Sequence, residues 1–213
     1  MGSIATQMLF KKLREQYREI GKPDVMLTQS NLVLVQDLVA TSSRFQFDIL
    51  NNEGTPKSWE IRLSQNDSFH LQGLQFFLTT AGATTDDSEV DLMTYPNQVT
   101  LGVAPPVDWR NLWRGEFNIT INNVTVVQSL SSIQFESVPQ TQGVVAGAGN
   151  AVDQKRMSSD TMFNFAPTIN ISGSRKNSLE LTIPQPVTLA IANSCIVCVC
   201  SGIVAIGGSS FQS

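Results

Sequence analysis

One histidine, His70, is the only side chain of its type that this 213-residue chain offers for proton transfer near neutral pH. It stands between Phe69 and Leu71, and in a strand its side chain would point away from both neighbours. No Gly-x-Ser-x-Gly motif of a nucleophile elbow accompanies it. We therefore expect His70 to have a structural or surface role. We expect no enzymatic activity, no catalytic residues and no cofactor.

Three cysteines form a second cluster that could do chemistry, in the spacing Cys195-x-x-Cys198-x-Cys200. A structural zinc ion needs four ligands that converge as a tetrahedron. On a strand, Cys198 and Cys200 face one way and Cys195 faces the other, and the sequence holds no second cysteine pair. The pattern predicts buried free thiols, no metal, and assembly in a reducing compartment.

An acidic segment between residues 79 and 91 raises the question of calcium, because carboxylate oxygens are the ligands that Ca²⁺ prefers. The segment lacks the glycine and the terminal glutamate of a calcium loop. This spacing favours a solvated loop. The acidic residues are Asp86, Asp87, Glu89 and Asp91.

Two tryptophans could form a binding surface for sugars. Trp109, Leu112 and Trp113 lie at positions i, i+3 and i+4, so one short helical turn would place both rings on one side. Buried, these rings would pack in the core or against another subunit. Exposed, they would be stacking platforms for a carbohydrate. Both interpretations stay open from the sequence.

The N-terminal segment is the one stretch with helical periodicity, and we expect a helix over residues 3–20 that ends at Gly21 and Pro23. Residues 1–22 carry a charge of +3, whereas the whole chain carries −4, so the remainder carries −7. A basic arm on an acidic body is typical of a segment that contacts an anionic partner, although a helix packed on the sheet is the simpler interpretation. The apolar stripe is Leu9, Leu13, Tyr17 and Ile20; the candidate contact residues are Lys11, Lys12, Arg14 and Arg18.

Residues 23–213 read as a single antiparallel β-domain. The segment from Glu116 to Val127 shows the pattern most clearly: apolar and polar residues alternate on both sides of Asn122-Asn123, a pair that tolerates the positive φ of a tight hairpin turn. Similar runs recur at short spacing without βα alternation, which indicates an all-β, two-sheet sandwich. The expected strands include 32–40, 44–50, 59–63, 69–78 with a bulge at Gly73, 133–138, 161–165, 179–183, 187–192 and 196–206, with a further strand signal at Ile169 and Ile171. The last run is apolar on both faces, so it should be central or covered.

Several segments resemble the jelly-roll capsid proteins of tailless icosahedral bacteriophages. They are Ser64–Phe69, Met93–Asn97, Asn118–Asn123, Val138–Gln142 and Asn177–Pro184, together with the helix that precedes the β-domain. The resemblance implies a structural subunit that forms trimers or pentamers and tiles a shell, sometimes over an internal membrane. A double jelly roll usually needs a longer chain, so a single jelly roll is expected here.

The resemblance therefore implies a virion protein, assembled in the host cytoplasm, that self-associates into an icosahedral shell, with a second capsid protein as a further partner. Its basic N-terminal helix would face the genome or an internal membrane. Only 15% of residues are charged, and abundant neutral polar residues suit packing against copies of the same chain. The alternative is a carbohydrate-binding or adhesin-like β-sandwich module that uses Trp109 and Trp113. A hydrolase on a β-scaffold is the third hypothesis.

Overall fold

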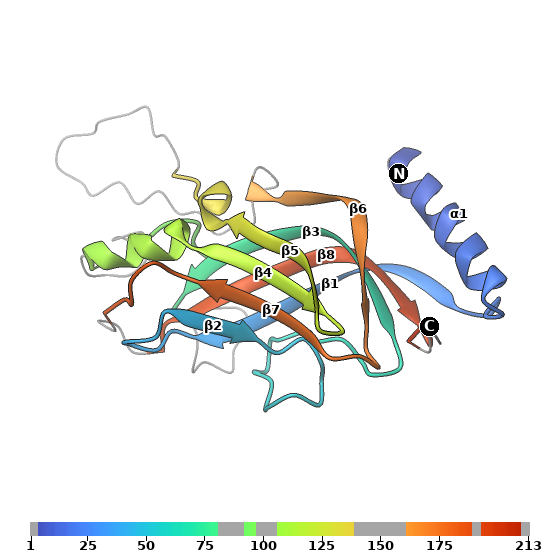
Figure 1. Cartoon of the computed structure of the whole chain (residues 1–213), viewed down its shortest axis with the longest axis horizontal. Coiled ribbons are helices and arrows are strands. Elements are labelled where there is room, and N and C mark those ends of the chain that lie inside the picture. Colours follow the sequence, from blue (N-terminus) through green and yellow to red (C-terminus); the bar gives the residue numbers. More distant parts are fainter. Residues whose placement is uncertain (1–3, 81–91, 97–105, 139–160, 189–192, 210–213) are drawn as a thin grey trace.

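The computed structural model describes residues 4–80, 92–96, 106–138, 161–188 and 193–209, which form one α-helix and eight strands (Figure 1). The helix α1 spans Ile4–Glu19. The strands are β1 (Met26–Asp37), β2 (Arg44–Phe47), β3 (Ser68–Thr79), β4 (Glu116–Ile121), β5 (Val124–Ser131), β6 (Phe163–Ser172), β7 (Asn177–Thr182) and β8 (Cys195–Ile206). Two short 3-10 helices, η2 (Val107–Arg114) and η3 (Ser132–Phe135), flank the β4–β5 hairpin.

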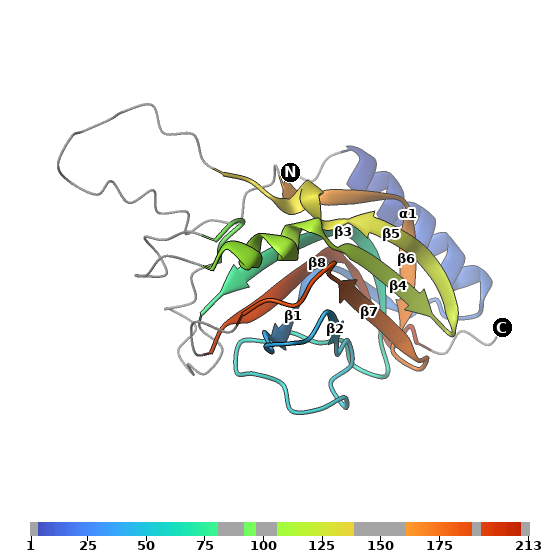
Figure 2. The same ribbon diagram turned by 60° about the vertical axis from the view of Figure 1, so that its left-hand side comes forward.

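The strands form two four-stranded antiparallel sheets that pack face to face (Figure 2). Sheet A has the order β1-β8-β3-β6 and sheet B has the order β2-β7-β4-β5. The pairing is nested: β1 pairs with β8, β2 with β7, β3 with β6, and β4 with β5. The expected two-sheet antiparallel sandwich with an N-terminal helix is confirmed.

The β4–β5 hairpin forms where the alternating pattern placed it. Asn122 and Asn123 form the turn with φ values of 51° and 64°, which are the positive angles that a two-residue hairpin turn demands. Phe117 and Ile119 of β4 point into the core, with exposed fractions of 0% and 2%. Ser129, also at positive φ, donates its N–H to the Asn118 side chain at 3.0 Å and interrupts the regular pairing of the two strands.

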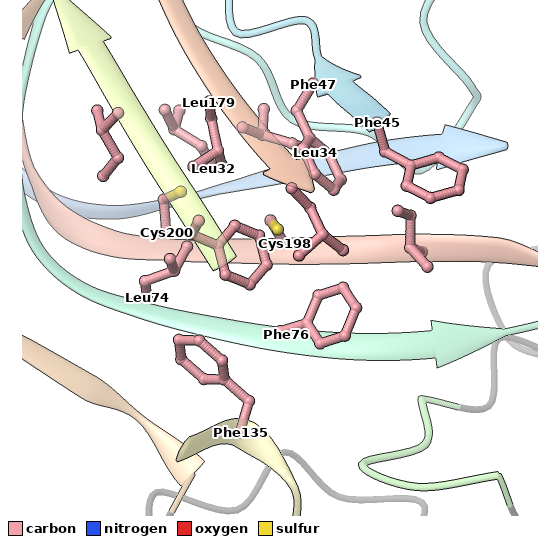
Figure 3. Packing of buried hydrophobic residues seen from close by; sticks show 14 of the residues in the cluster. Leu32, Leu34, Phe45, Phe47, Leu74, Phe76, Phe135, Leu179, Cys198 and Cys200 are labelled. Carbon is pink, nitrogen blue, oxygen red and sulfur yellow. The ribbon is translucent and has the colours of Figure 1, made fainter. Parts of the chain in front are cut away.

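The final strand is central and covered on both faces, as its uninterrupted apolar run predicts. β8 lies between β1 and β3. Cys198 and Cys200 point into the space between the sheets (Figure 3), whereas Val197 and Val199 form a smaller apolar cluster on the outer face of sheet A. The Trp59 ring packs against that outer cluster. The expected bulge at Gly73 is also confirmed, by a register shift between Leu71 and Gly73.

Aromatic side chains fill the core next to the hairpin. Phe76 of β3 makes edge-to-face contacts with Trp113, Phe117 and Phe135, with ring centroids 5.6, 5.3 and 6.4 Å apart. Phe135 comes from η3 and lies next to β3, close to Phe76 (Figure 3). This cluster joins sheet A, sheet B and both 3-10 helices.

Two expected strands are absent from the part of the chain that the structure describes. Residues 59–63 form only isolated bridges, Val33 with Ile61 and Leu50 with Leu63, and otherwise run as a loop. Residues 133–138 begin inside η3 instead of a strand, because Ser132 bonds back to Gly115 through both its backbone N–H and its side chain and turns the chain inward. Val187 and Thr188 are not in a strand either, and the remainder of the expected strand 187–192 lies outside the described residues.

The helix α1 lies against the outer face of sheet A, beside β6 in both views (Figures 1 and 2). His70 points to this outer face because its neighbours Phe69 and Leu71 belong to the core between the sheets. Leu13 and Tyr17 are the buried residues among the α1 side chains that the structure describes. Leu9 is half-buried and Ile20, just beyond the helix, is 44% exposed, so the predicted apolar stripe is buried only at its middle.

Candidate interaction surfaces

Three of the four predicted basic residues lie on one exposed face of α1. Lys11, Arg14 and Arg18 follow one another at spacings of three and four and line one shallow hollow with Gln7, Phe10 and Glu15. We call this surface the basic face. Within the described residues, none of its three cations takes part in an ion pair shorter than 4.0 Å. The face therefore offers three solvated cations, one carboxylate and a half-buried phenyl ring.

Lys12 belongs to a different surface. It is exposed, but it lines a groove of about 420 Å³ between α1 and β6 together with Glu19, His70 and Asn170. A helix turns by about 100° per residue, so Lys12 cannot share the face of Lys11. The sequence grouped these four basic residues, and the structure brings three of them together.

A second surface lies along one side of the sandwich, where each sheet ends in an edge strand. β5 is one of the two edge strands of sheet B, and β6 is one of the two edge strands of sheet A. A cleft of about 750 Å³ opens between them, and we call it the edge cleft. Its walls are apolar and amide side chains with one cation, Arg175; the apolar wall includes Val124, Val126, Phe163 and Phe165, and the amides are Asn122, Asn164 and Asn170.

The two tryptophans are not exposed. Trp109 and Trp113 are both 0% exposed, and the Trp109 indole N–H donates to the carbonyl oxygen of Thr188 at 2.7 Å. A ring that is fully covered has no face for a sugar, so the stacking platform considered from the sequence is not available in this structure. The helical turn that carries them is η2, a 3-10 helix. The acidic residues Asp86 to Asp91 lie outside the described residues.

The cysteines are buried free thiols. Cys195, Cys198 and Cys200 have exposed fractions of 0%, 0% and 3%. Burial raises the pKa of Cys195 and of Cys200 to about 12 and also raises the pKa of Cys198, so all three remain protonated near neutral pH. No group of three or more histidine, cysteine or acidic side chains in the described ranges is arranged to hold a metal ion.

His70 has a partner that the sequence did not suggest. The His70 ring is 5% exposed, and its Nε2 lies 2.9 Å from the Tyr17 hydroxyl oxygen of α1. Burial lowers the pKa of His70 to about 4, so the ring is neutral near pH 7. The contact joins residues 53 positions apart, and no local spacing pattern could have indicated it.

A buried ion pair in the loop over sheet A was also missed. The side chains of Glu60 and Arg62 are 1% and 4% exposed and lie 2.9 Å apart. Glu60 also accepts the backbone N–H of Val35 at 2.8 Å and that of Lys57 at 2.7 Å. Through these contacts, Glu60 and Arg62 hold residues 57–62 against β1. In the sequence, Glu60 and Arg62 alternate with Trp59, Ile61 and Leu63. This pattern is the same as that of a strand with one exposed polar face, so it did not indicate a buried ion pair.

Comparison with protein-family models and with curated protein sequences finds no match to this chain. Among the described residues, no helix is both long enough and apolar enough to span a bilayer. The strand topology, the basic face and the edge cleft are the features of the described residues that bear on function.

Proposed function

We propose that this chain is a single jelly-roll capsid subunit, a structural protein that assembles with copies of itself into an icosahedral shell. The observation that carries the proposal is the nested pairing of the eight strands, first with last and fourth with fifth. Strands paired in this way form one long antiparallel hairpin of four strand pairs. When this hairpin wraps into a sandwich, it gives two four-stranded sheets with a jelly-roll connection, an architecture found in viral capsid proteins, lectins and cupins. Because this fold occurs in proteins with different functions, the choice among these functions depends on the interior and the exposed surfaces of this chain.

The interior of the sandwich favours a structural role over a ligand-binding one. An enclosed space among the core side chains of both sheets, lined by Leu34, Ile49, Leu74 and Cys200 among others, measures about 10 Å³. A space of this size holds at most about one water molecule. Ligands of a cupin-like barrel would need far more room between the sheets. The surfaces that remain for function are on the outside.

The edge cleft supports self-association. Unpaired edge strands are templates for pairing with another chain, and soluble monomers usually protect them. Here Val124 and Val126 of the β5 edge are 62% and 47% exposed. The cleft carries apolar groups, amides and one cation, so it suits a neutral, amide-rich partner surface such as this chain's own. Closure by symmetry, as trimers or pentamers with or without a second capsid protein, then builds a finite particle.

The basic face of α1 supports contact with the genome or with an internal membrane. Both are polyanionic surfaces, and each basic residue near an anionic membrane contributes about 1 kcal/mol. Lys11, Arg14 and Arg18 are exposed together on one side of the helix. Phe10 adds an apolar group to the same face.

A pair of matched variants tests self-association through the edge cleft. Val126→Lys places a charge on the β5 edge, and Val107→Lys places the same charge on η2, where Val107 is 91% exposed. We expect sedimentation velocity to show large assemblies for the unmodified chain and for Val107→Lys, and small species for Val126→Lys. If Val126→Lys forms assemblies as large as those of Val107→Lys, the edge cleft has no role in self-association. Tryptophan fluorescence checks that both variants are folded.

A further inference from the structure

The attachment of α1 to the sandwich depends on few side chains. Leu13 and Tyr17 are 3% and 2% exposed, whereas the other described α1 side chains are half-buried or exposed. Below the helix, the Lys22 side chain donates to the carbonyl oxygen of Gly207 at 3.2 Å. A helix held in this way buries little apolar surface, so the loss of one favourable contact changes its docking equilibrium substantially.

Tyr17 contacts the outer face of sheet A at His70. The hydroxyl oxygen of Tyr17 lies 2.9 Å from Nε2 of His70, and the two rings meet edge to face at 85° with centroids 5.8 Å apart. A neutral imidazole with its proton on Nδ1 accepts the Tyr17 O–H at Nε2. A doubly protonated imidazole has no acceptor nitrogen, so Tyr17 would have to turn its proton away and accept the Nε2–H at its hydroxyl oxygen. The cost of charging His70 therefore lies in its burial beneath α1, not in the loss of this hydrogen bond.

The surroundings of His70 disfavour its charged form. From α1, Lys12 and Glu19 are the charged side chains that line the groove beside His70, and they have opposite signs. From β6, the groove residues are the neutral Thr168 and Asn170, and the β8 residue opposite His70 is Ile203. Burial is the dominant cause that lowers the pKa of His70 to about 4. The same burial raises the pKa of Tyr17.

We propose that the Tyr17–His70 contact is an acid-sensitive latch: protonation of His70 releases α1 from sheet A and frees the basic face to move away from the body. When α1 lifts off, His70 on the outer face of β3 becomes solvated, so the protonated ring no longer carries the cost of burial. The latch belongs to the folded subunit itself and does not depend on the shell function proposed above.

The direction and size of the effect follow from proton linkage. Burial lowers the pKa of docked His70 to about 4, and a solvated histidine has a pKa near 6.5, so the undocked state binds more protons in the interval between these values. Docking is therefore strongest above pH 6.5, weakens as the pH falls toward 4, and changes little below that. The docking equilibrium should weaken about 30-fold at pH 5 and on the order of 10²-fold below pH 4.

The first test is an NMR titration of the full chain, in which the single histidine gives one unambiguous imidazole signal. We expect His70 to titrate at least one unit below 6.5. In Leu13→Asn, which places a polar amide at a buried α1 position without adding a charge, its pKa should return to near 6.5, whereas in Gln7→Asn, at an exposed α1 position, it should stay low. A value near 6.5 in the unmodified chain, or no difference between the two variants, would overturn the latch.

The second test follows the arm directly. A nitroxide label at Met8→Cys reports on α1, because Met8 is 68% exposed whereas the three native thiols are buried. The label should become mobile between pH 6.5 and 4 while the tryptophan emission, which comes from buried Trp109 and Trp113 and from half-buried Trp59, stays constant. The variant His70→Gln should show no such pH dependence. Release that also occurs in His70→Gln, or that coincides with a change in tryptophan emission, would refute the proposal, since the cause would then be another group or global unfolding.

Discussion

Neutralising the basic face of α1 should sharply weaken binding of the chain to anionic surfaces. The perturbation is the triple variant Lys11→Gln, Arg14→Gln and Arg18→Gln, three exposed residues that line one hollow of the helix. At about 1 kcal/mol per basic residue, the loss is about 3 kcal/mol, or roughly a 100- to 200-fold weaker association. Removing three exposed charges should leave the folded body intact, because none of them forms a short ion pair within the described residues.

Co-sedimentation with vesicles that contain anionic lipid, and filter binding of single-stranded RNA, measure the loss on the two surfaces separately. Glu15→Gln is an informative counterpart: it removes the carboxylate of the basic face and should strengthen binding by a few-fold. Arg110→Gln with Arg114→Gln is the control, because both arginines are exposed on η2, away from the arm. Raising the salt concentration should abolish most of the difference, because it screens exposed charges.

A triple variant that binds vesicles and RNA as tightly as the unmodified chain would contradict the role of the basic face. An η2 control that loses as much affinity as the triple variant would contradict it as well. In either case the positive charge of residues 1–22 would have no specific role, and α1 would be a packing element only.

Three further predictions concern the β-sandwich. Phe76→Ala should lower the free energy of unfolding by about 3–5 kcal/mol, because the ring is fully buried among three aromatic partners. Val107→Ala, at an exposed position, should change the free energy of unfolding by no more than about 0.5 kcal/mol. Urea denaturation followed by tryptophan fluorescence measures both. Glu60→Leu should lower the free energy of unfolding by about 3 kcal/mol, because it leaves the buried Arg62 without its closest carboxylate. This value is at the low end for a broken buried ion pair, since Asp48 remains 3.6 Å from the Arg62 guanidinium. A variant as stable as the unmodified chain in the same urea denaturation would contradict a stabilising role of the Glu60–Arg62 pair. The native chain should not react with a thiol reagent at pH 8, and unfolding should expose three reactive thiols; rapid reaction without denaturant would contradict the burial of Cys195, Cys198 and Cys200.

Local patterns predicted the elements whose formation depends on local chemistry. The alternation around Asn122 and Asn123 placed the β4–β5 hairpin because the asparagine pair supplies the positive φ that the turn needs. The apolar run of β8 identified a strand covered on both faces, since only a central strand can bury every side chain. The helical spacing of Leu13 and Tyr17 placed both on the face of α1 that is buried.

The expected strand at residues 59–63 failed for a reason that involves a distant segment. Ile61 makes one bridge with Val33 of β1, as a strand would. The next donor of β1, the N–H of Val35, is taken by the carboxylate of Glu60 instead of a backbone carbonyl. Pairing therefore stops after one bridge. Sequence alternation shows which side chains face inward, but it does not show that a side chain will replace the backbone as acceptor.

The candidate surfaces were predicted only in part for the same reason. Charge counting found the basic arm but grouped Lys12 with Lys11, Arg14 and Arg18, although the helical repeat alone places Lys12 on a different face. The edge cleft was not predictable, because it depends on which strands end at the edges of the two sheets. The Tyr17–His70 contact depends on where α1 docks, which no spacing within the helix determines.

Electron microscopy of the concentrated full chain, with and without single-stranded nucleic acid, tests most directly whether this sandwich is a shell subunit. We expect closed, isometric particles of uniform diameter, in which sheets of neighbouring copies meet at the β5 and β6 edges. Monomers at every concentration, in the presence and absence of nucleic acid, would contradict it.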